Sequence, residues 1–189
     1  MDRLEEYAKE NNIPIMQRDG IIFLTNYIRE NNVKTILEIG TAIGYSAINM
    51  ALVSKDIKIV TIERDKERYK EAIKNISLFK LDDQIQVLFS DALETEIDDM
   101  FDLIFIDAAK AQYIKFFEKY KVNLKEKGVI ISDNLDFHGL THDDVVIKNK
   151  NLRALVKKIN DYKAFLQENK EFNTEFIDIG DGIGISKRV

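Results

Sequence analysis

One stretch, ILEIGTAIGYSAI at residues 36–48, constrains the fold of this chain more than any other: an apolar strand runs into a glycine turn and then into a helix. Gly40 and Gly44 lack a Cβ, so the backbone there can turn sharply and bring its amides close to a ligand. A helix expected at 45–54 directs its N-terminal amides toward the same turn. The stretch is therefore typical of a βαβ unit that binds a ligand at the turn.

An acidic residue at the end of the next strand indicates what kind of ligand this is. The apolar run 59–62 ends in Glu63, 23 residues after Gly40, where a carboxylate can accept hydrogen bonds from both ribose hydroxyls. Ala42 replaces the second glycine of the dinucleotide pattern G-x-G-x-x-G, and Glu38 would repel a pyrophosphate. The unit predicts a nucleoside ligand with a cationic group and disfavours NAD. A tight turn without any ligand is the alternative.

Residues 1–189 are expected to form a single domain, because 45% hydrophobic content over 189 residues supports one well-packed core. The chain has no cysteine, which excludes disulfides and thiolate metal sites. It shows no signal-peptide pattern and no apolar run of about 18 residues. The expected location is therefore the cytoplasm, and no membrane partner is predicted.

Charge is distributed unevenly along the chain. A net charge of −5 argues weakly against a nucleic-acid partner, yet positive charge is concentrated in the basic segment 145–163. Against the single acid Asp161, this segment carries Lys148, Lys150, Arg153, Lys157, Lys158 and Lys163. Either a solvated helix face or a phosphate-binding patch explains it.

Apolar runs alternate with helix-like segments along the chain, which predicts a doubly wound α/β sheet. Strands are expected at 35–39, 58–62, 85–89, 102–107 and 128–132, the first four of them parallel and buried, and helices at 18–31, 45–54, 65–79, 111–124 and 148–169. The final segments FNTEFIDIG and GIGISKR are separated only by a turn at 180–182, so they must be antiparallel. A Rossmann-like sheet that is mostly parallel with an antiparallel terminal strand is similar to that of class I S-adenosylmethionine methyltransferases.

A second group of polar residues follows two of the expected strands. Asp107 ends one strand, and Asp133 and Asn134 end another. If the strands are neighbours, two carboxylates and an amide oxygen converge into a hard, partly open site suited to Mg²⁺. Lys110 could then reach a substrate hydroxyl as a base. Taken singly, these residues are also explained as loop caps and a surface lysine.

Several motifs together resemble a known family. LEIGTAIGYSAI, TIERD, SDALE, FIDAAKAQY and ISDN occur in the order found in the metal-dependent O-methyltransferases of the catechol and caffeoyl-CoA type, over nearly the whole chain. LEEYAKENNIPIM, IFIDAAKAQY and GDGIGISK are most similar to the bacterial tRNA 5-hydroxyuridine methyltransferases. Those enzymes make 5-methoxyuridine at the wobble position of the anticodon.

The resemblance implies a role for individual residues. Lys110 would be the catalytic lysine, and Asp107, Asp133 and Asn134 would hold Mg²⁺ or another divalent cation. His138 stands where relatives often have another polar or basic residue, and we expect it on the rim of the site rather than at the metal. The residues implied to bind S-adenosylmethionine are Met16, then Glu38, Gly40 and Ser46 at its amino-acid end, Glu63 at the ribose, Asp91 and Ala92 at the adenine, and Asp107.

The expected function is magnesium-assisted methylation of 5-hydroxyuridine in a tRNA anticodon loop by a homodimeric enzyme. An O-methyltransferase of a small catechol or phenylpropanoid is the nearest alternative, because the metal and lysine chemistry would be the same. A nucleoside-binding module without catalysis is an alternative of another class, and it would have no use for Lys110 or the three oxygen ligands.

Overall fold

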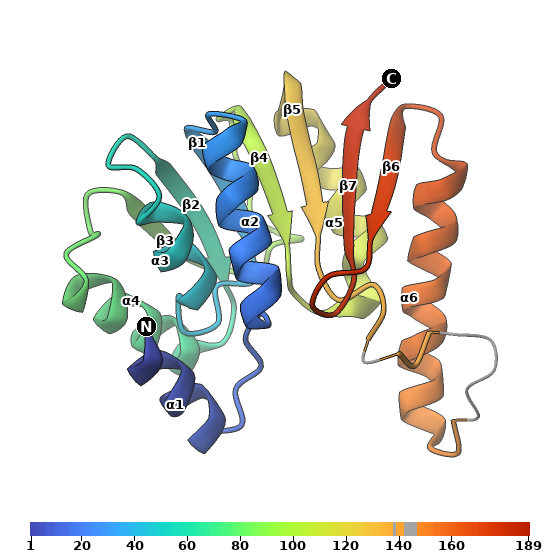
Figure 1. Cartoon of the computed structure of the whole chain (residues 1–189), viewed down its shortest axis with the longest axis horizontal. Coiled ribbons are helices and arrows are strands. Elements are labelled where there is room, and N and C mark those ends of the chain that lie inside the picture. Colours follow the sequence, from blue (N-terminus) through green and yellow to red (C-terminus); the bar gives the residue numbers. More distant parts are fainter. Residues whose placement is uncertain (138, 142–146) are drawn as a thin grey trace.

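In a computed structural model of the chain, residues 1–137, 139–141 and 147–189 are described. Seven strands form one sheet in the order β3-β2-β1-β4-β5-β7-β6 (Figure 1). The strands are β1 (Thr35–Ile39), β2 (Lys58–Glu63), β3 (Ile85–Phe89), β4 (Phe101–Ile106), β5 (Leu124–Ser132), β6 (Phe172–Ile177) and β7 (Ile183–Arg188). The α-helices are α1 (Asp2–Glu10), α2 (Arg18–Glu30), α3 (Tyr45–Ala51), α4 (Lys66–Leu78), α5 (Tyr113–Tyr120) and α6 (Lys150–Glu168).

The predicted sheet is confirmed. Strands β1 to β5 pair in parallel, and β7 runs antiparallel between β5 and β6. The strand order reverses between β1 and β4, since β2 and β3 extend the sheet to one side and β4 and β5 to the other. A doubly wound sheet binds its ligands at such a point, beyond the carboxyl ends of the strands.

Three local expectations were wrong. Strand β3 is not buried, because it forms the edge of the sheet and leaves Phe89 51% exposed. The expected helix 111–124 is divided into a 3₁₀ turn (Lys110–Gln112), α5 and a second 3₁₀ turn (Lys121–Asn123). Strand β5 then begins at Leu124 rather than at 128, because the Asn123 side-chain amide donates to the Ile97 and Asp99 carbonyls and ends the helix there.

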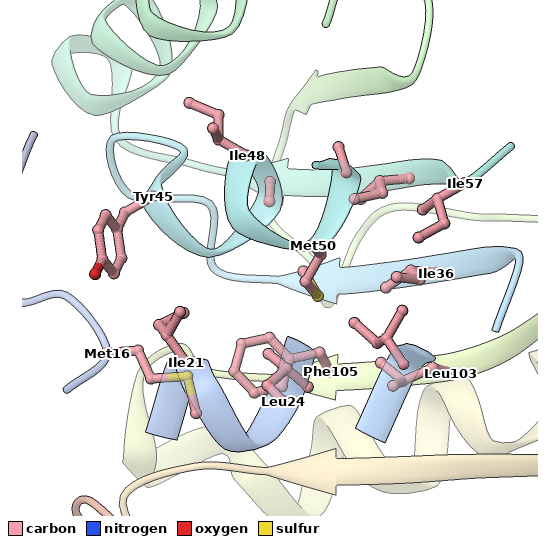
Figure 2. Packing of buried hydrophobic residues seen from close by; sticks show 14 of the residues in the cluster. Met16, Ile21, Leu24, Ile36, Tyr45, Ile48, Met50, Ile57, Leu103 and Phe105 are labelled. Atoms are coloured by element: carbon pink, nitrogen blue, oxygen red, sulfur yellow. The ribbon is translucent and has the colours of Figure 1, made fainter. Parts of the chain in front are cut away.

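The apolar core has two layers, one on each face of the sheet. Helices α1 to α4 contribute to one layer, and α5 and α6 to the other. Figure 2 shows part of the first layer, where Ile21 and Leu24 of α2 and Met50 of α3 lie against Ile36 and Phe105 of the sheet. Each such side chain stabilises the fold by about 1.5–3 kcal/mol when fully buried. This layer packs α3, the helix that follows the glycine turn, against the sheet.

The turn between β6 and β7 lies against the loop that follows β5. The amide of Leu135 donates to the Gly182 carbonyl at 2.9 Å, and that of Asp136 donates to the Asp181 carbonyl at 2.8 Å. A Cβ on Gly182 would come within 2.5 Å of the Asp136 nitrogen, so this close approach requires glycine. The terminal hairpin therefore fixes the position of the loop that carries Asn134.

Within the described ranges, no helix has both the length and the apolar character needed to cross a bilayer. His138, expected on the rim of the site, and residues 145 and 146 of the basic segment lie outside the described residues.

Candidate active site

A pocket of about 250 Å³ opens beyond the carboxyl ends of β1, β2 and β4. Its wall comes from the segment before α2, the turn after β1, the ends of β2 and β3, and the loops after β4 and β5. Seven of the residues expected at the cofactor or catalytic site line it together: Met16, Gly40, Ser46, Glu63, Ala92, Asp107 and Lys110. Two of the expected metal ligands, Asp107 and Asn134, line it as well.

The glycine turn forms one wall of the pocket and touches the end of β4. Gly40 has φ of +104°, and a Cβ there would lie 2.1 Å from the Asp107 carbonyl oxygen. Gly44 also has positive φ, at +83°, and precedes the first residue of α3. Ala42 adopts φ of +46°, a conformation that is uncommon for a residue with a side chain. The turn thus brings the end of β4 closer to β1 than any side chain at Gly40 would allow.

Glu63 is held in one orientation by backbone amides. Its Oε2 accepts from the Ala42 amide at 2.9 Å, and its Oε1 accepts from the Asp65 amide at 2.8 Å. Each carboxylate oxygen has a further lone pair, so Glu63 can still accept from a ligand. Because Glu63 lines the pocket and is only 7% exposed, those lone pairs suit the paired hydroxyls of a ribose.

Glu38 lies behind the pocket wall and is completely buried. Its carboxylate accepts hydrogen bonds from the hydroxyls of Ser46 and Thr61, and the Thr41 and Thr61 hydroxyls lie 2.6 Å apart. Burial raises the pKa of Glu38 to about 7, although the two hydroxyl donors act in the opposite direction. Ser46 and Thr41 line the pocket, whereas Glu38 and Thr61 lie one step behind it.

The side chains that follow β4 and β5 converge as predicted. Ile106 and Ser132 are register partners, and the next residues are Asp107 and Asp133. The Asn134 side-chain nitrogen lies 3.5 Å from Asp107 Oδ1. Burial is the largest cause that raises the pKa of both carboxyls, and the charge of Asp107 raises that of Asp133 further.

The surroundings of Asp133 indicate whether Asp107, Asp133 and Asn134 fit a metal ion. Its side chain is 1% exposed, and within the described chain neither carboxylate oxygen has a hydrogen-bond partner. A buried carboxylate without a partner is costly, and a divalent cation offsets that cost. Among the described residues, no three His, Cys, Asp or Glu side chains are grouped for metal binding, so the candidate ligands are two carboxylates together with the side-chain amide of Asn134. Asp107, Asp133 and Asn134 fit a hard cation on these grounds.

Lys110 lies in the 3₁₀ turn after β4 and lines the pocket with Asp107. Its Nζ lies 5.4 Å from the centre of the Phe137 ring, a cation–π contact, and its charge lowers the pKa of Asp107. Asp91 is outside the pocket wall: it accepts from the Leu93 amide at 2.9 Å and pairs with Arg64 at 3.3 Å. Those bonds orient the loop that places Ala92 in the wall.

Sequence reasoning missed several residues of the site. Thr41, Tyr45, Arg64 and Arg68 line the pocket, and Thr61 supports it from behind. Thr61 left a signal in the sequence, because it precedes Glu63 by two residues and so points to the same face of β2. Its register partner in β1 is Glu38, which explains the contact between the two.

A parallel sheet with this strand order, a reversed β7 and a nucleoside-type pocket beside its reversal point is the class I methyltransferase fold. Residues 1–189 match the O-methyltransferase family, and the chain belongs to that family.

Solved and curated relatives agree with this assignment. A Staphylococcus aureus protein provisionally assigned as a caffeoyl-CoA O-methyltransferase is 41% identical, with a TM-score of 0.95 over 100% of this chain and 91% of its own. An O-methyltransferase from Bacillus cereus, solved in complex with S-adenosylhomocysteine, is 25% identical, with a TM-score of 0.83 over 100% and 90% of the two chains. The caffeoyl-CoA O-methyltransferase of Populus kitakamiensis is 27% identical over 88% of this chain and 75% of its own.

Proposed function

We propose that this O-methyltransferase transfers the methyl group of S-adenosylmethionine to the 5-hydroxyl of 5-hydroxyuridine at the wobble position of a tRNA. The observation that carries the proposal is the position of Lys110, which lines one pocket together with Asp107, Asn134 and the glycine turn. A nucleophile held by the first group would face a methyl donor held by the second. Positioning of this kind contributes much of the rate in a displacement reaction.

The chain would bind the donor along the length of the pocket. Ser46 and Thr41 would contact its amino-acid part, and Glu63 offers acceptors for its ribose hydroxyls. Ala92 and Met16 would contact the donor through apolar surface. The S-adenosylhomocysteine complex of the Bacillus cereus relative supports this choice of cofactor.

The chemical step would depend on Lys110. Its Nζ would take the proton of the substrate hydroxyl as the oxygen forms a bond to the methyl carbon and the carbon–sulfur bond breaks, leaving neutral S-adenosylhomocysteine. Asp107, Asp133 and Asn134 would hold Mg²⁺, which when bound lowers the pKa of the hydroxyl and orients it. The 5-hydroxyl and 4-carbonyl of 5-hydroxyuridine are on adjacent carbons, so both oxygens can face these three residues.

The start of α6 supports an RNA substrate. Lys148, Lys150 and Arg153 are exposed, and among the residues that the structure describes none of the three pairs with a carboxylate. Figure 1 shows that α6 begins at the same end of the sheet at which the parallel strands finish, the end that carries the pocket. Phosphates of a single-stranded loop could contact these side chains while one base enters the pocket.

The nearest alternative is a small phenolic substrate, and the name of the Populus relative favours it. Purified protein should be given labelled S-adenosylmethionine with either tRNA that carries 5-hydroxyuridine or catechol. We expect methyl transfer to the tRNA, with 5-methoxyuridine found by mass spectrometry of its nucleosides. Strong turnover of catechol with none of the tRNA would refute the proposal, and no turnover of either substrate would favour a binding module.

A variant that lacks the positive charges at the start of α6 tests the RNA contact separately. Replacing Lys148, Lys150 and Arg153 by Ala should weaken tRNA binding and flatten its dependence on salt, since each phosphate contact contributes to that slope. A control variant replaces Lys70 and Lys74 of α4, which pair with Glu67 and Glu71, and it should leave the salt dependence of tRNA binding unchanged. An unchanged salt slope in the triple variant would remove the start of α6 from the interface.

A further inference from the structure

The hydroxyl groups behind the glycine turn are connected in a way that decides which of their atoms can face a ligand. We infer that Thr61 is a positioning residue: together with Glu38 it turns the hydroxyls of Thr41 and Ser46 so that they present hydrogen-bond acceptors to the α-ammonium group of the cofactor. The inference rests on the use of S-adenosylmethionine and not on the identity of the methyl acceptor.

With Glu38 ionised, the state that a cationic ligand favours, counting protons fixes the direction of every bond in this network. A hydroxyl group has one proton to donate and two lone pairs. The Ser46 proton goes to Glu38 Oε1, and the Thr61 proton goes to Glu38 Oε2. Since Thr61 has no second proton, Thr41 must donate in the 2.6 Å contact between the two threonines. All three protons are therefore used inside the network.

The consequence for the pocket is that Thr41 and Ser46 have only lone pairs left to offer. Both residues line the pocket. The Ser46 hydroxyl is hydrogen-bonded directly to the Glu38 carboxylate, and the Thr41 hydroxyl is connected to it through Thr61. An ammonium group carries three donors and no acceptor, so it matches this surface, whereas a carboxylate would meet lone pairs alone. The negative charge acts on the ligand although Glu38 itself is completely buried.

The backbone makes the arrangement possible. Glu38 and Thr61 are register partners in the parallel pair β1 and β2, so their side chains project from the same face of the sheet. Thr41 is held nearby because its amide, like that of Gly40, donates to the Ile62 carbonyl. Thr61 is completely buried and outside the pocket lining, which is why it acts through its neighbours rather than on the ligand.

Two ligands separate this role from a structural one. S-adenosylhomocysteine carries the ammonium group, and 5′-methylthioadenosine has the same adenosine and thioether without the amino-acid part. In calorimetry, Thr61→Val should weaken binding of S-adenosylhomocysteine by about tenfold, the value of one hydrogen bond to a charged group. Binding of 5′-methylthioadenosine should stay within twofold, and Thr61→Ser should restore the first ligand to within twofold of wild type.

Thr174→Val is the matched control, because it removes a similar hydroxyl pair, Thr174 with Ser186 at 2.8 Å, on the far strands β6 and β7. It should change neither affinity. If Thr61→Val does not fold, Thr61→Ala removes the same hydroxyl and should affect S-adenosylhomocysteine selectively. Equal weakening of both ligands, or no weakening of S-adenosylhomocysteine, would overturn the inference. Failure of the tRNA assay would leave these affinities unaffected, so the two proposals fail separately.

Discussion

Gly40 provides the sharpest test of how the cofactor turn is coupled to the metal ligands. A Cβ at this position would lie 2.1 Å from the Asp107 carbonyl oxygen and 2.8 Å from its carbonyl carbon. Since non-bonded Cβ atoms essentially never approach closer than 3.0 Å, the Gly40→Ala variant must move position 40 and the end of β4 apart by about 0.9 Å, the difference between 3.0 and 2.1 Å. Asp107, the first expected metal ligand, would move with it.

The cost has two parts. A side chain held at φ of +104° costs about 1–3 kcal/mol, and forcing extra volume into a packed site costs about 1–3 kcal/mol more. We expect Gly40→Ala to lower the free energy of unfolding by about 2–6 kcal/mol in urea titrations. A displacement of about 1 Å in a group of the active site can cost about 100-fold in rate. If Gly40→Ala folds, its kcat should therefore fall by about 100-fold.

Gly44→Ala is the control for the conformational part alone. Gly44 has a similar positive φ of +83°, but a methyl group at this position would have its nearest neighbours, on Ala72 and Ile48, 3.6 Å away. The Gly44→Ala variant should therefore lose only about 1–3 kcal/mol of unfolding free energy. Equal destabilisation by the two substitutions would refute the claim that the contact with Asp107, rather than the backbone conformation, is what requires glycine at position 40.

Three further predictions concern the site. The pKa of Glu38 is raised from 4.5 to about 7 in the folded protein, so the free energy of unfolding should fall by about 2–3 kcal/mol from pH 5 to pH 8 and level off above about pH 8. The difference in unfolding free energy between wild type and Glu38→Gln should follow this curve, and a difference that does not change with pH would contradict the raised pKa. Lys110→Met should reduce kcat by about 100- to 10,000-fold, as measured by single-turnover kinetics, and should leave the affinity for S-adenosylhomocysteine unchanged in calorimetry. A variant with a higher KM and an unchanged kcat would argue against a proton-transfer role for Lys110. Chelation of divalent cations should abolish turnover while S-adenosylhomocysteine still binds within about threefold, and activity in metal-free buffer would exclude the proposed role of Asp133.

Much of the fold could be predicted from local sequence patterns. The apolar run before Gly40, the acidic residue Glu63 and the short turn before β7 each report the conformation of a few neighbouring residues. Local periodicity carries that information because side chains alternate along a strand and repeat along a helix. The limits of the pattern are visible at Asn123, where bonds to two carbonyls some 25 residues earlier end a helix that periodicity would continue.

The sequence by itself determined which residue types end the strands, and so the chemistry available at the site: carboxylates, an amide, a lysine and a glycine turn. Only the tertiary structure decided how they meet. Pairing of β4 with β5 brings Asn134 to Asp107, and pairing of β1 with β2 sets Thr61 against Glu38 and buries that carboxylate behind the wall. Strand order and register arise from contacts between residues far apart in the chain, and no local pattern encodes those contacts.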